Sequence, residues 1–486
     1  MQNQTPLFPG FHLQTLRRKP RSAQQIFADK IHQLKQKSFS QLGECLGKFI
    51  PEKFLQPAKS GQHSRQRLFS KHNTFWAFFS QILDADGGCK EVVRKIQATS
   101  AMKGKTLPSS STAAYCQARH KLSSDTLTSI LAHTTQQLQS TSSPEMFHKR
   151  RVVVVDGTGV SMPDTKRNQE IWPQQALQKP GCGFPQAAIC ACFCLHTGAM
   201  LSYELGNKKS HELPMLRKQW DTFRSGDIFL GDKGFCSFYD VHSFKERGVD
   251  SVITLARRKP VSAAEAVKVL GKDDVLVHWK RPSQSKTPYS NWHELPEDLL
   301  LRQIKVTIDQ PGFRSTSFYI ITTLLDATKY PADDIADLYF QRWQVELNFR
   351  DLKTTLGMDI LRCKSPEMVR KEIIMYFIAY NCLRSLIIEA ATKNKIDHQR
   401  LSFKATLQAL RQWEPLINQT KNIAANLYQL MNNLHDAIAK NIVLNRPGRS
   451  EPRAVKRRPK PYRLLTSPRH EMVVEPHRGK KHTKQA

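Results

Sequence analysis

PADDIADLYFQRWQVELNFRDLKTTLG, residues 331–357, predicts one long helix around which the rest of the chain is organised. Asp333 and Asp334 directly after Pro331 form a helix start signal, because carboxylates in the first turn complement the positive end of the helix dipole. Gly357 is a stop signal. At about 100° per residue, one side of this helix carries an apolar stripe made of Leu338, Val345, Phe349, Leu352 and Leu356. We expect this side to be buried.

A row of polar side chains lies beside the apolar stripe. Tyr339, Arg342, Glu346 and Lys353 fall within roughly 60° of one another around the helix axis. With a rise of 1.5 Å per residue, the row is about 21 Å long and can follow several phosphates of a nucleic-acid strand. A single Glu beside arginines at helical spacing is more often a solvated ion pair than a catalyst. A catalytic role for Glu346 is therefore favoured only if other acids lie near it.

Two further acids stand at the ends of short apolar runs. RVVVVDGTGV, residues 151–160, reads as a buried strand that delivers Asp156 to its carboxyl end. SGDIFLGDKGF, residues 225–235, repeats this pattern with Asp232. Each acid alone is more often a turn or cap residue. Together with Glu346 they suit a pair of hard cations, which prefer oxygen ligands.

The spacing of Tyr339, Arg342, Glu346 and Lys353 resembles the Tyr-Arg-Glu-Lys signature of DDE transposases encoded by bacterial insertion sequences. The resemblance covers nearly the whole chain, and the helix signature is its most specific part. Its other segments are 75–98, 112–122, 156–165, 178–188, 231–238, 378–387, 401–411 and 445–465. The chain departs from the family pattern at Gly159, where a hydroxyl residue is common.

The charge of the chain points to a polyanionic partner. It has 486 residues, more than one compact unit usually holds, and a formal net charge of +32. Nucleic acid is favoured over a membrane, because neither a signal peptide nor a long uncharged apolar span accompanies the charge. The most apolar run, residues 373–387, contains Asn381 and Arg384 and is better explained as a buried helix. We expect a cytoplasmic protein without a membrane partner.

The cysteines indicate a reducing compartment. Ten cysteines spread over this length do not form the pattern of a disulfide framework. Cys190, Cys192 and Cys194 alternate along one run. Zinc sites usually space paired cysteines by two to four residues, so we expect buried strand residues here rather than a metal site.

Residues 1–148 are expected to form a helical, basic DNA-binding domain. Residues 112–120 and 125–139 have the proportions of a helix-turn-helix, with Arg119 and Lys121 near the joint. Two packed helices with exposed bases explain the same pattern equally well. The resemblance favours DNA, because in the family the N-terminal region recognises the terminal repeats of the element.

The remaining chain is expected to be an α/β protein with a ribonuclease H-like mixed sheet. A hairpin followed by strands alternating with helices predicts the first part of this catalytic core at residues 149–256. A β-rich insertion follows at 257–317, and residues 318–445 complete the core and add C-terminal helices. Residues 446–486 contain thirteen Lys or Arg and three Glu and are expected to be a flexible basic tail that binds phosphates.

Two tryptophans in or near the insertion are candidates for stacking on a base. In transposases similar to this one, such an insertion handles the DNA end, and an aromatic ring can receive a flipped base. Trp292 and Trp279 are the candidates in this sequence. Each of them, taken alone, is more often a core residue.

The resemblance implies cut-and-paste transposition. Asp156, Asp232 and Glu346 would hold two Mg²⁺ ions, for which Mn²⁺ can substitute, with Asp156 bridging both. Tyr339, Arg342 and Lys353 would position phosphates. The implied partners are double-stranded DNA, as inverted-repeat ends and target, and a second copy of the chain in a homodimeric synaptic complex.

Three other activities would each use part of this pattern. A tyrosine recombinase would use Tyr339 as nucleophile but leaves the three acids without a role. A catalytically inactive or domesticated transposase would act only as a DNA-binding repressor. An ordinary metal-dependent nuclease would not require the helix signature, the insertion or the basic flanks.

Overall fold

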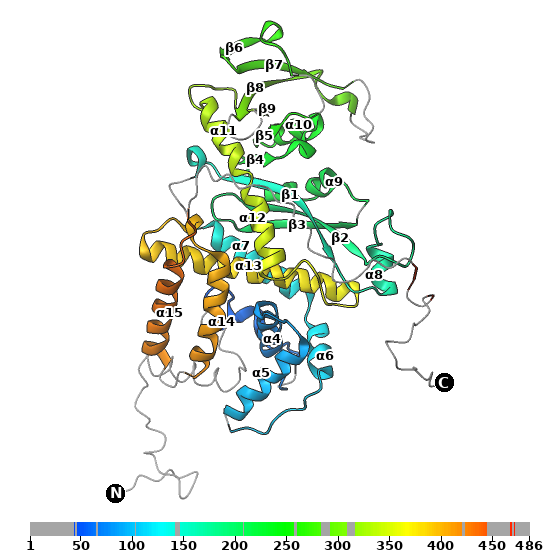
Figure 1. Ribbon diagram of the computed structural model, residues 1–486, viewed down its shortest axis with the longest axis vertical. Helices are drawn as coiled ribbons and strands as arrows, with labels where there is room; N and C mark the ends of the chain where they lie inside the picture. The colour runs from blue at the N-terminus through cyan, green and yellow to red at the C-terminus, as the bar shows by residue number, and fades with distance from the viewer. Residues whose placement is uncertain are drawn as a thin grey trace, which may run out of the picture. The chain divides into compact units, whose positions relative to one another are not determined.

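The structure is a computed structural model, and it divides into two compact units (Figure 1). The first unit contains residues 1–126 and 386–443, and the second contains residues 127–385 and 444–486. The residues described are 43, 46–64, 67–102, 104–140, 146–207, 209–256, 260–282, 292–308, 316–419, 423–444, 467–468 and 471. The predicted basic tail, residues 446–486, therefore lies almost entirely outside the described residues.

A mixed sheet forms the centre of the second unit. Among the described residues it has nine strands in the order β3-β2-β1-β4-β5-β9-β8-β7-β6 (Figure 1). The strands are β1 Val152–Ser161, β2 Gln186–Cys194, β3 Met200–Asn207, β4 Ile228–Gly231, β5 Asp250–Thr254, β6 Lys268–Gly271, β7 Asp274–Lys280, β8 Asp298–Ile308 and β9 Thr316–Thr322. Strands β1, β4 and β5 are parallel neighbours, and every other pairing is antiparallel.

The register of β1 against β4 decides where the acids fall. Val152 pairs with Ile228, and Val154 pairs with Leu230. Asp156 lies two residues beyond Val154, and Asp232 lies two residues beyond Leu230, so both acids stand at the level where the pairing of β1 with β4 ends. The prediction that Asp156 stands at the end of its strand is wrong, because β1 continues to Ser161 in antiparallel pairing with β2. The run from Val152 to Val155 is buried throughout, as expected for the interior of a parallel region covered on both faces.

Helices cover both faces of this sheet. On one face, α9 Glu212–Arg217 and α10 Phe238–Glu246 bury their apolar side chains in a cluster with residues of β1, β2, β4 and β5. On the other face, the ring of Phe193 in β2 packs against Phe349 at 5.3 Å and Tyr380 at 6.0 Å between centroids. Cys192 belongs to the cluster that α9 and α10 cover, whereas Phe193 packs against Phe349 and Tyr380. Adjacent residues of β2 therefore face opposite layers.

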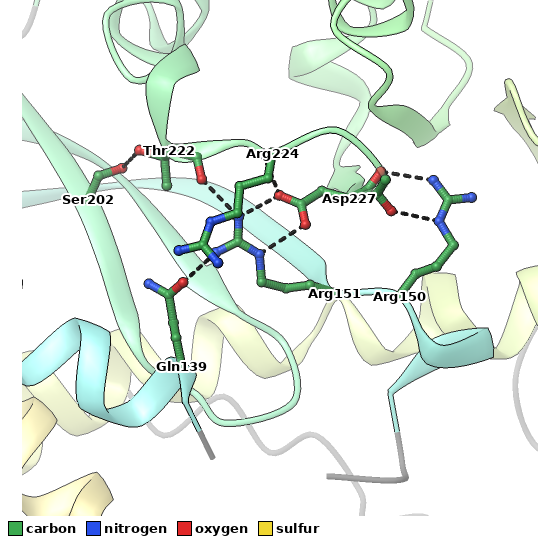
Figure 2. A network of polar contacts seen from close by, with 8 residues as sticks. Gln139, Arg150, Arg151, Ser202, Thr222, Arg224 and Asp227 are labelled. Carbon is green, nitrogen blue, oxygen red and sulfur yellow. Dashed lines mark hydrogen bonds and ion pairs between the residues drawn. The ribbon is translucent and has the colours of Figure 1, made fainter. Parts of the chain in front are cut away.

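Two arginines hold together the amino-terminal ends of β1, β4 and β5. Figure 2 shows Asp227, which precedes β4, between Arg150 and Arg151, which precede β1. Arg151 Nη2 and Nε donate to the Asp227 carboxylate at 2.5 and 3.0 Å, and Arg150 Nη2 donates to Asp250 Oδ2 at 2.6 Å. Gln139 Oε1 accepts from Arg151 Nη1 at 2.7 Å. These bonds fix the relative heights of the three parallel strands.

The strands between residues 257 and 317 extend the same sheet. Strand β9 pairs with β5 on one side and with β8 on the other, and β7 and β6 follow outward. The predicted hairpin is confirmed as β2 and β3, and Cys190, Cys192 and Cys194 are buried in β2 as predicted.

The first unit is helical. Helix α4, Lys71–Leu83, is buried along most of its length and packs against α5 Cys89–Met102 and α6 Ala113–Lys121. The other helices of the chain are α7 Ser124–Gln139, α8 Lys166–Ile171, α11 Ala332–Gln341, α12 Gln344–Arg350, α13 Pro366–Asn394, α14 Phe403–Gln419 and α15 Ile423–Ala439. Both helices of the predicted helix-turn-helix are present as α6 and α7.

Helix α13 is long and apolar enough to cross a membrane by length and composition. Of its most apolar window, 89% is buried. Asn381 in its centre donates to Thr135 Oγ1 at 3.1 Å and accepts from Met200 N at 3.0 Å. These features are those of a core helix in a soluble protein, as predicted for residues 373–387.

We predict that Arg151→Met lowers the free energy of unfolding by about 3 kcal/mol, because Asp227 would remain buried without its partner. Arg224→Met is the matched control, since the Arg224 side chain is exposed and only its backbone N–H donates to Asp227. Urea unfolding measures both. Equal stability of the two variants would contradict a structural role for the Arg151 pair.

Candidate active site

The segment 331–357 does not form the single regular helix predicted from its sequence. Helix α11 ends at Gln341, α12 begins at Gln344, and a π-helical turn follows at Asp351–Thr355. Between the helices the backbone tightens into i→i−3 hydrogen bonds, such as Arg342 N to Tyr339 O at 3.0 Å. The prediction of one regular helix is therefore wrong across this joint, but Arg342 still lies beside both Tyr339 and Glu346, as predicted for one side of the segment. The apolar stripe is confirmed, since all five of its members are buried.

Asp156 and Asp232 are each held by a neighbouring backbone amide. Asp156 Oδ1 accepts from Gly157 N at 2.8 Å, and Asp232 Oδ1 accepts from Gly234 N at 2.7 Å. Asp232 also caps the short 3₁₀ turn Lys233–Phe235. In each aspartate one carboxylate oxygen is fixed by this hydrogen bond. In metal sites, hydrogen bonds of this kind from residues that do not touch the metal orient the carboxylates that do.

Glu346 reaches the same region from α12, which packs against β1. Burial raises the pKa of Asp156 above its usual value, the Gly157 amide opposes this shift, and the charges of Asp232 and Glu346 raise the pKa further. Arg342 acts in the opposite direction and lies 3.8 Å from Glu346. The pairing of β1 with β4 and the packing of α12 thus bring Asp232 and Glu346 within electrostatic reach of Asp156.

The chemistry of these donors suits a hard divalent cation. They are carboxylate oxygens that repel one another, and a cation between them would relieve that repulsion. As the side chains are placed, no three His, Cys, Asp or Glu residues in the described part of the chain close around one point. Ligation therefore requires movement of these side chains, and Asp232 and Glu346 are only partly buried.

Three predicted phosphate-binding residues have different surroundings. The Tyr339 hydroxyl accepts a hydrogen bond from Thr254 Oγ1 at the end of β5. Arg342 lies over the Tyr339 ring, 5.8 Å from its centroid, and its buried Nε has no hydrogen-bond partner within the described ranges. Lys353 lies in the π-helical turn and pairs with Asp359 at 3.1 Å. Arg342 is the one with an unsatisfied donor.

The two tryptophans proposed to stack on a base pack against the protein core. Trp279 is 9% exposed, and its ring lies 5.6 Å from that of Phe238. Trp292 is partly buried against the same cluster, 6.4 Å from Phe238. Burial contradicts the base-stacking prediction for Trp279, because stacking needs an accessible ring face. For Trp292 the stacking role stays a prediction.

Arg119 is a core residue rather than a surface base, which corrects its predicted DNA contact. It is 9% exposed, its Nη1 donates to Gln81 Oε1 at 2.9 Å, and its guanidinium lies 4.8 Å from the centre of the Phe78 ring. Lys121 is exposed and lines a cavity of about 710 Å³ together with His63 and Arg67. Lys121 remains available to an anionic partner.

Sequence reasoning missed Glu212, the first residue of α9. A Cβ atom on Gly157 would lie 1.8 Å from Glu212 Oε1, so this carboxylate sits directly beside the backbone that follows Asp156. Burial raises the pKa of Glu212, and the charges of Asp156 and Asp232 raise it further. A Glu in the first turn of a helix is ordinary, so the sequence offered no signal beyond the glycine after Asp156.

A buried carboxylate also lies in the π-helical turn. Asp351 is 7% exposed. Burial raises its pKa to about 6, although the charges of Arg384 and Arg350 oppose the shift. Its ionisation at neutral pH therefore costs folding free energy.

Comparisons with known proteins converge on one group. The family model described as "Transposase DDE domain" matches residues 147–382. Transposase InsG of insertion sequence element IS4 from Escherichia coli (strain K12) is 24% identical over 329 residues, 67% of this chain and 72% of that protein. Putative transposase InsL of IS186A from the same organism is 35% identical over 78 residues, 16% of this chain and 20% of that protein.

One solved structure was also similar. It is the piggyBac transposase synaptic complex with hairpin DNA, which aligns with a TM-score of 0.42 and 11% identity over 85% of this chain and 87% of that chain.

We predict that Arg119→Met lowers the thermal unfolding temperature of the chain, because it leaves the buried Gln81 oxygen with one donor fewer and removes a stacked cation. Lys121→Ala should leave that temperature unchanged and weaken binding to DNA, as judged by the slope of affinity against salt. A destabilised Lys121→Ala variant together with a fully stable Arg119→Met variant would reverse these assignments.

We predict that Asp351→Asn stabilises the chain by about 2 kcal/mol at pH 7.5. The folded pKa of about 6 exceeds the ordinary 3.8, so the folded state binds more protons between these values. Stability is therefore lost as pH rises through this window, and the advantage of Asn should disappear near pH 4. Urea unfolding of the wild type and the variant at both pH values measures this difference in stability. A variant that is less stable at pH 7.5 would show that the arginines stabilise the charged form.

Proposed function

Residues 147–382 of this chain are a transposase DDE domain of the kind that insertion sequences encode, and from this premise we propose cut-and-paste DNA transposition as its function. The chain would bind the terminal inverted repeats of its own element, cleave the DNA at those ends and join them to a target. The reaction class is metal-dependent hydrolysis and transesterification of DNA phosphodiesters.

One observation carries this proposal. Asp156 and Asp232 follow equivalent positions of two parallel strands in register, and Glu346 reaches them from α12. The strand order β3-β2-β1-β4-β5, with β1, β4 and β5 parallel, supports a ribonuclease H-like core in which acids meet at one edge. Acidic side chains from three separated parts of the sequence thus share one edge of the sheet.

The acids would divide the metal ligands among them. Asp156, Asp232 and Glu346 would hold the divalent ions through their carboxylate oxygens. When bound, two Mg²⁺ ions, or Mn²⁺ in their place, would lower the pKa of the attacking water and stabilise the leaving 3′-oxygen. The Gly157 and Gly234 amides would keep Asp156 and Asp232 oriented during both steps.

Arg342 and Tyr339 are suited to hold the DNA phosphate. Arg342 Nε is buried and has no hydrogen-bond partner among the described residues, which supports phosphate binding by this guanidinium, since Arg binds phosphates through paired donors. Lys353 would act as a point charge farther along the strand once released from Asp359. The contact of the Tyr339 hydroxyl with Thr254 agrees with a positioning role rather than that of a nucleophile.

Two partners follow from this function. Double-stranded DNA would be bound both as element ends and as target, and the formal charge of +32 favours such a polyanion. Two ends must be held together for coupled cleavage, so we propose a homodimer in the synaptic complex.

We predict that Glu346→Gln binds the element ends almost as tightly as wild type but cleaves them more than about 100-fold more slowly, beyond the usual effect of altering a partner of a metal ligand. Arg342→Ala should weaken both binding and cleavage, by about tenfold or more. Asp337→Asn is the control, because Asp337 is exposed on α11. The measurement is a gel assay of end binding, cutting and joining in Mg²⁺.

Repeating the assay in Ca²⁺ separates the alternatives. A transposase binds in both ions and cuts and joins in Mg²⁺. Binding without cutting in either ion would indicate a repressor, and degradation without joining would indicate a nuclease. Unimpaired cutting by Glu346→Gln would remove its metal assignment.

A further inference from the structure

We propose that Glu212 is a fourth carboxylate of the metal site, and that position 157 must be glycine so that this carboxylate can enter. The inference rests on the proposed function, because it assigns a further residue to the same site. Glu212 would bind the ion shared by Asp156 and Asp232, directly or through a bound water.

The placement of Glu212 depends on the missing side chain of Gly157. A Cβ there would lie 1.8 Å from Glu212 Oε1, 2.6 Å from Cδ and 3.0 Å from Cγ. These distances are far below van der Waals contact, so the end of the Glu212 side chain occupies the space that any other residue would fill. Since Gly157 N donates to Asp156 Oδ1 at 2.8 Å, the same peptide contacts both acids.

The second oxygen of Glu212 faces the other aspartate. A Cβ on Gly234 would lie 3.6 Å from Glu212 Oε2 and 2.9 Å from Asp232 Oδ1. One oxygen of Glu212 is therefore next to the backbone that orients Asp156, and the other is near the backbone that orients Asp232. A glycine lies at each place where this carboxylate approaches: Gly157 within β1 and Gly234 in the turn that follows β4.

Helix α9 holds Glu212 in this position. Met215 and Leu216 are buried in the cluster under the sheet, and α9 contacts β2, β3 and the 3₁₀ turn after Asp232. Arg217 adds a bidentate pair, with Nε and Nη2 each donating to Asp240 of α10 at 2.7 Å. The backbone of Glu212 is thus anchored one turn away.

The charge balance around Glu212 calls for a cation. The charged groups that act on Glu212 are Asp156 and Asp232, both acids. Arg342 offsets part of the charge around Asp156. A Glu that only stabilised the helix dipole of α9 could do so from a position away from the two other carboxylates. A divalent ion between them supplies the missing positive charge.

The test measures Mn²⁺ binding to the full chain by electron paramagnetic resonance, without DNA cleavage as a readout. Glu212→Gln should bind Mn²⁺ about 10- to 100-fold more weakly than wild type. Glu246→Gln, an exposed acid at the end of α10, is the matched control and should bind like wild type. Unchanged affinity of Glu212→Gln would overturn the role of Glu212 while leaving the three-acid site intact. Absence of Mn²⁺ binding by wild type would instead contradict the metal site and with it the proposed function.

A second variant tests the role of Gly157. Gly157→Ala should displace the Glu212 carboxylate and weaken Mn²⁺ binding as Glu212→Ala does. In the Glu212→Ala background, Gly157→Ala should cause no further loss, because nothing is left to displace. An equal loss in both backgrounds would show that the methyl group acts on Asp156 itself, and would contradict the coupling. Circular dichroism confirms that each variant is folded.

Discussion

The parallel pairing of β1 with β4 is the constraint on which the site depends. A shift of one residue between these strands would move Asp156 relative to Asp232 by about 3.3 Å and turn one of them toward the other face. The pairing of Val154 with Leu230 sets the level at the acidic end, and the Arg151 pair with Asp227 anchors the opposite end (Figure 2). The charged pair is buried, so its polar atoms need partners in the protein. Gln139 and the Thr222 carbonyl accept from Arg151, and the Arg224 backbone N–H donates to Asp227.

The same sheet allows acids to reach one edge from two layers. Helix α9 packs on the face that contains Cys192, and α12 packs on the face that contains Phe193. Glu212 and Glu346 therefore approach the ends of β1 and β4 from opposite sides. Collecting like charges costs folding free energy in the absence of a counterion, and the large apolar layers on both faces hold the arrangement in place. Binding of a cation would lower this cost, which supports the proposed role of the acids in a metal site.

Much of this could be predicted from the sequence, because some signals are local. The β-branched run at Val152–Val155 and the apolar residues before Gly231 predict strands, and Asp232 directly follows β4 as predicted. Asp156 instead lies within β1, whose second half is held by pairing with β2 and has no local apolar signal. The apolar period of residues 331–357 correctly predicts the buried side of the segment. The tight joint at Arg342 and the π-helical turn were missed, since hydrogen-bond shifts of one residue leave the apolar period nearly unchanged.

Other features could not be predicted because they depend on tertiary contacts. Arg119 looks like a surface base at a helix end, and only its packing against Gln81 and Phe78 shows otherwise. Glu212 looks like a helix-start residue until the fold places it beside Gly157.

The most direct test of the central claim is anomalous X-ray scattering from Mn²⁺ in crystals of the chain bound to its element ends. Convergence of the acids predicts a strong peak between Asp156, Asp232 and Glu346. Ordered density for the three side chains without a peak among them, or a peak elsewhere in the chain, would contradict it.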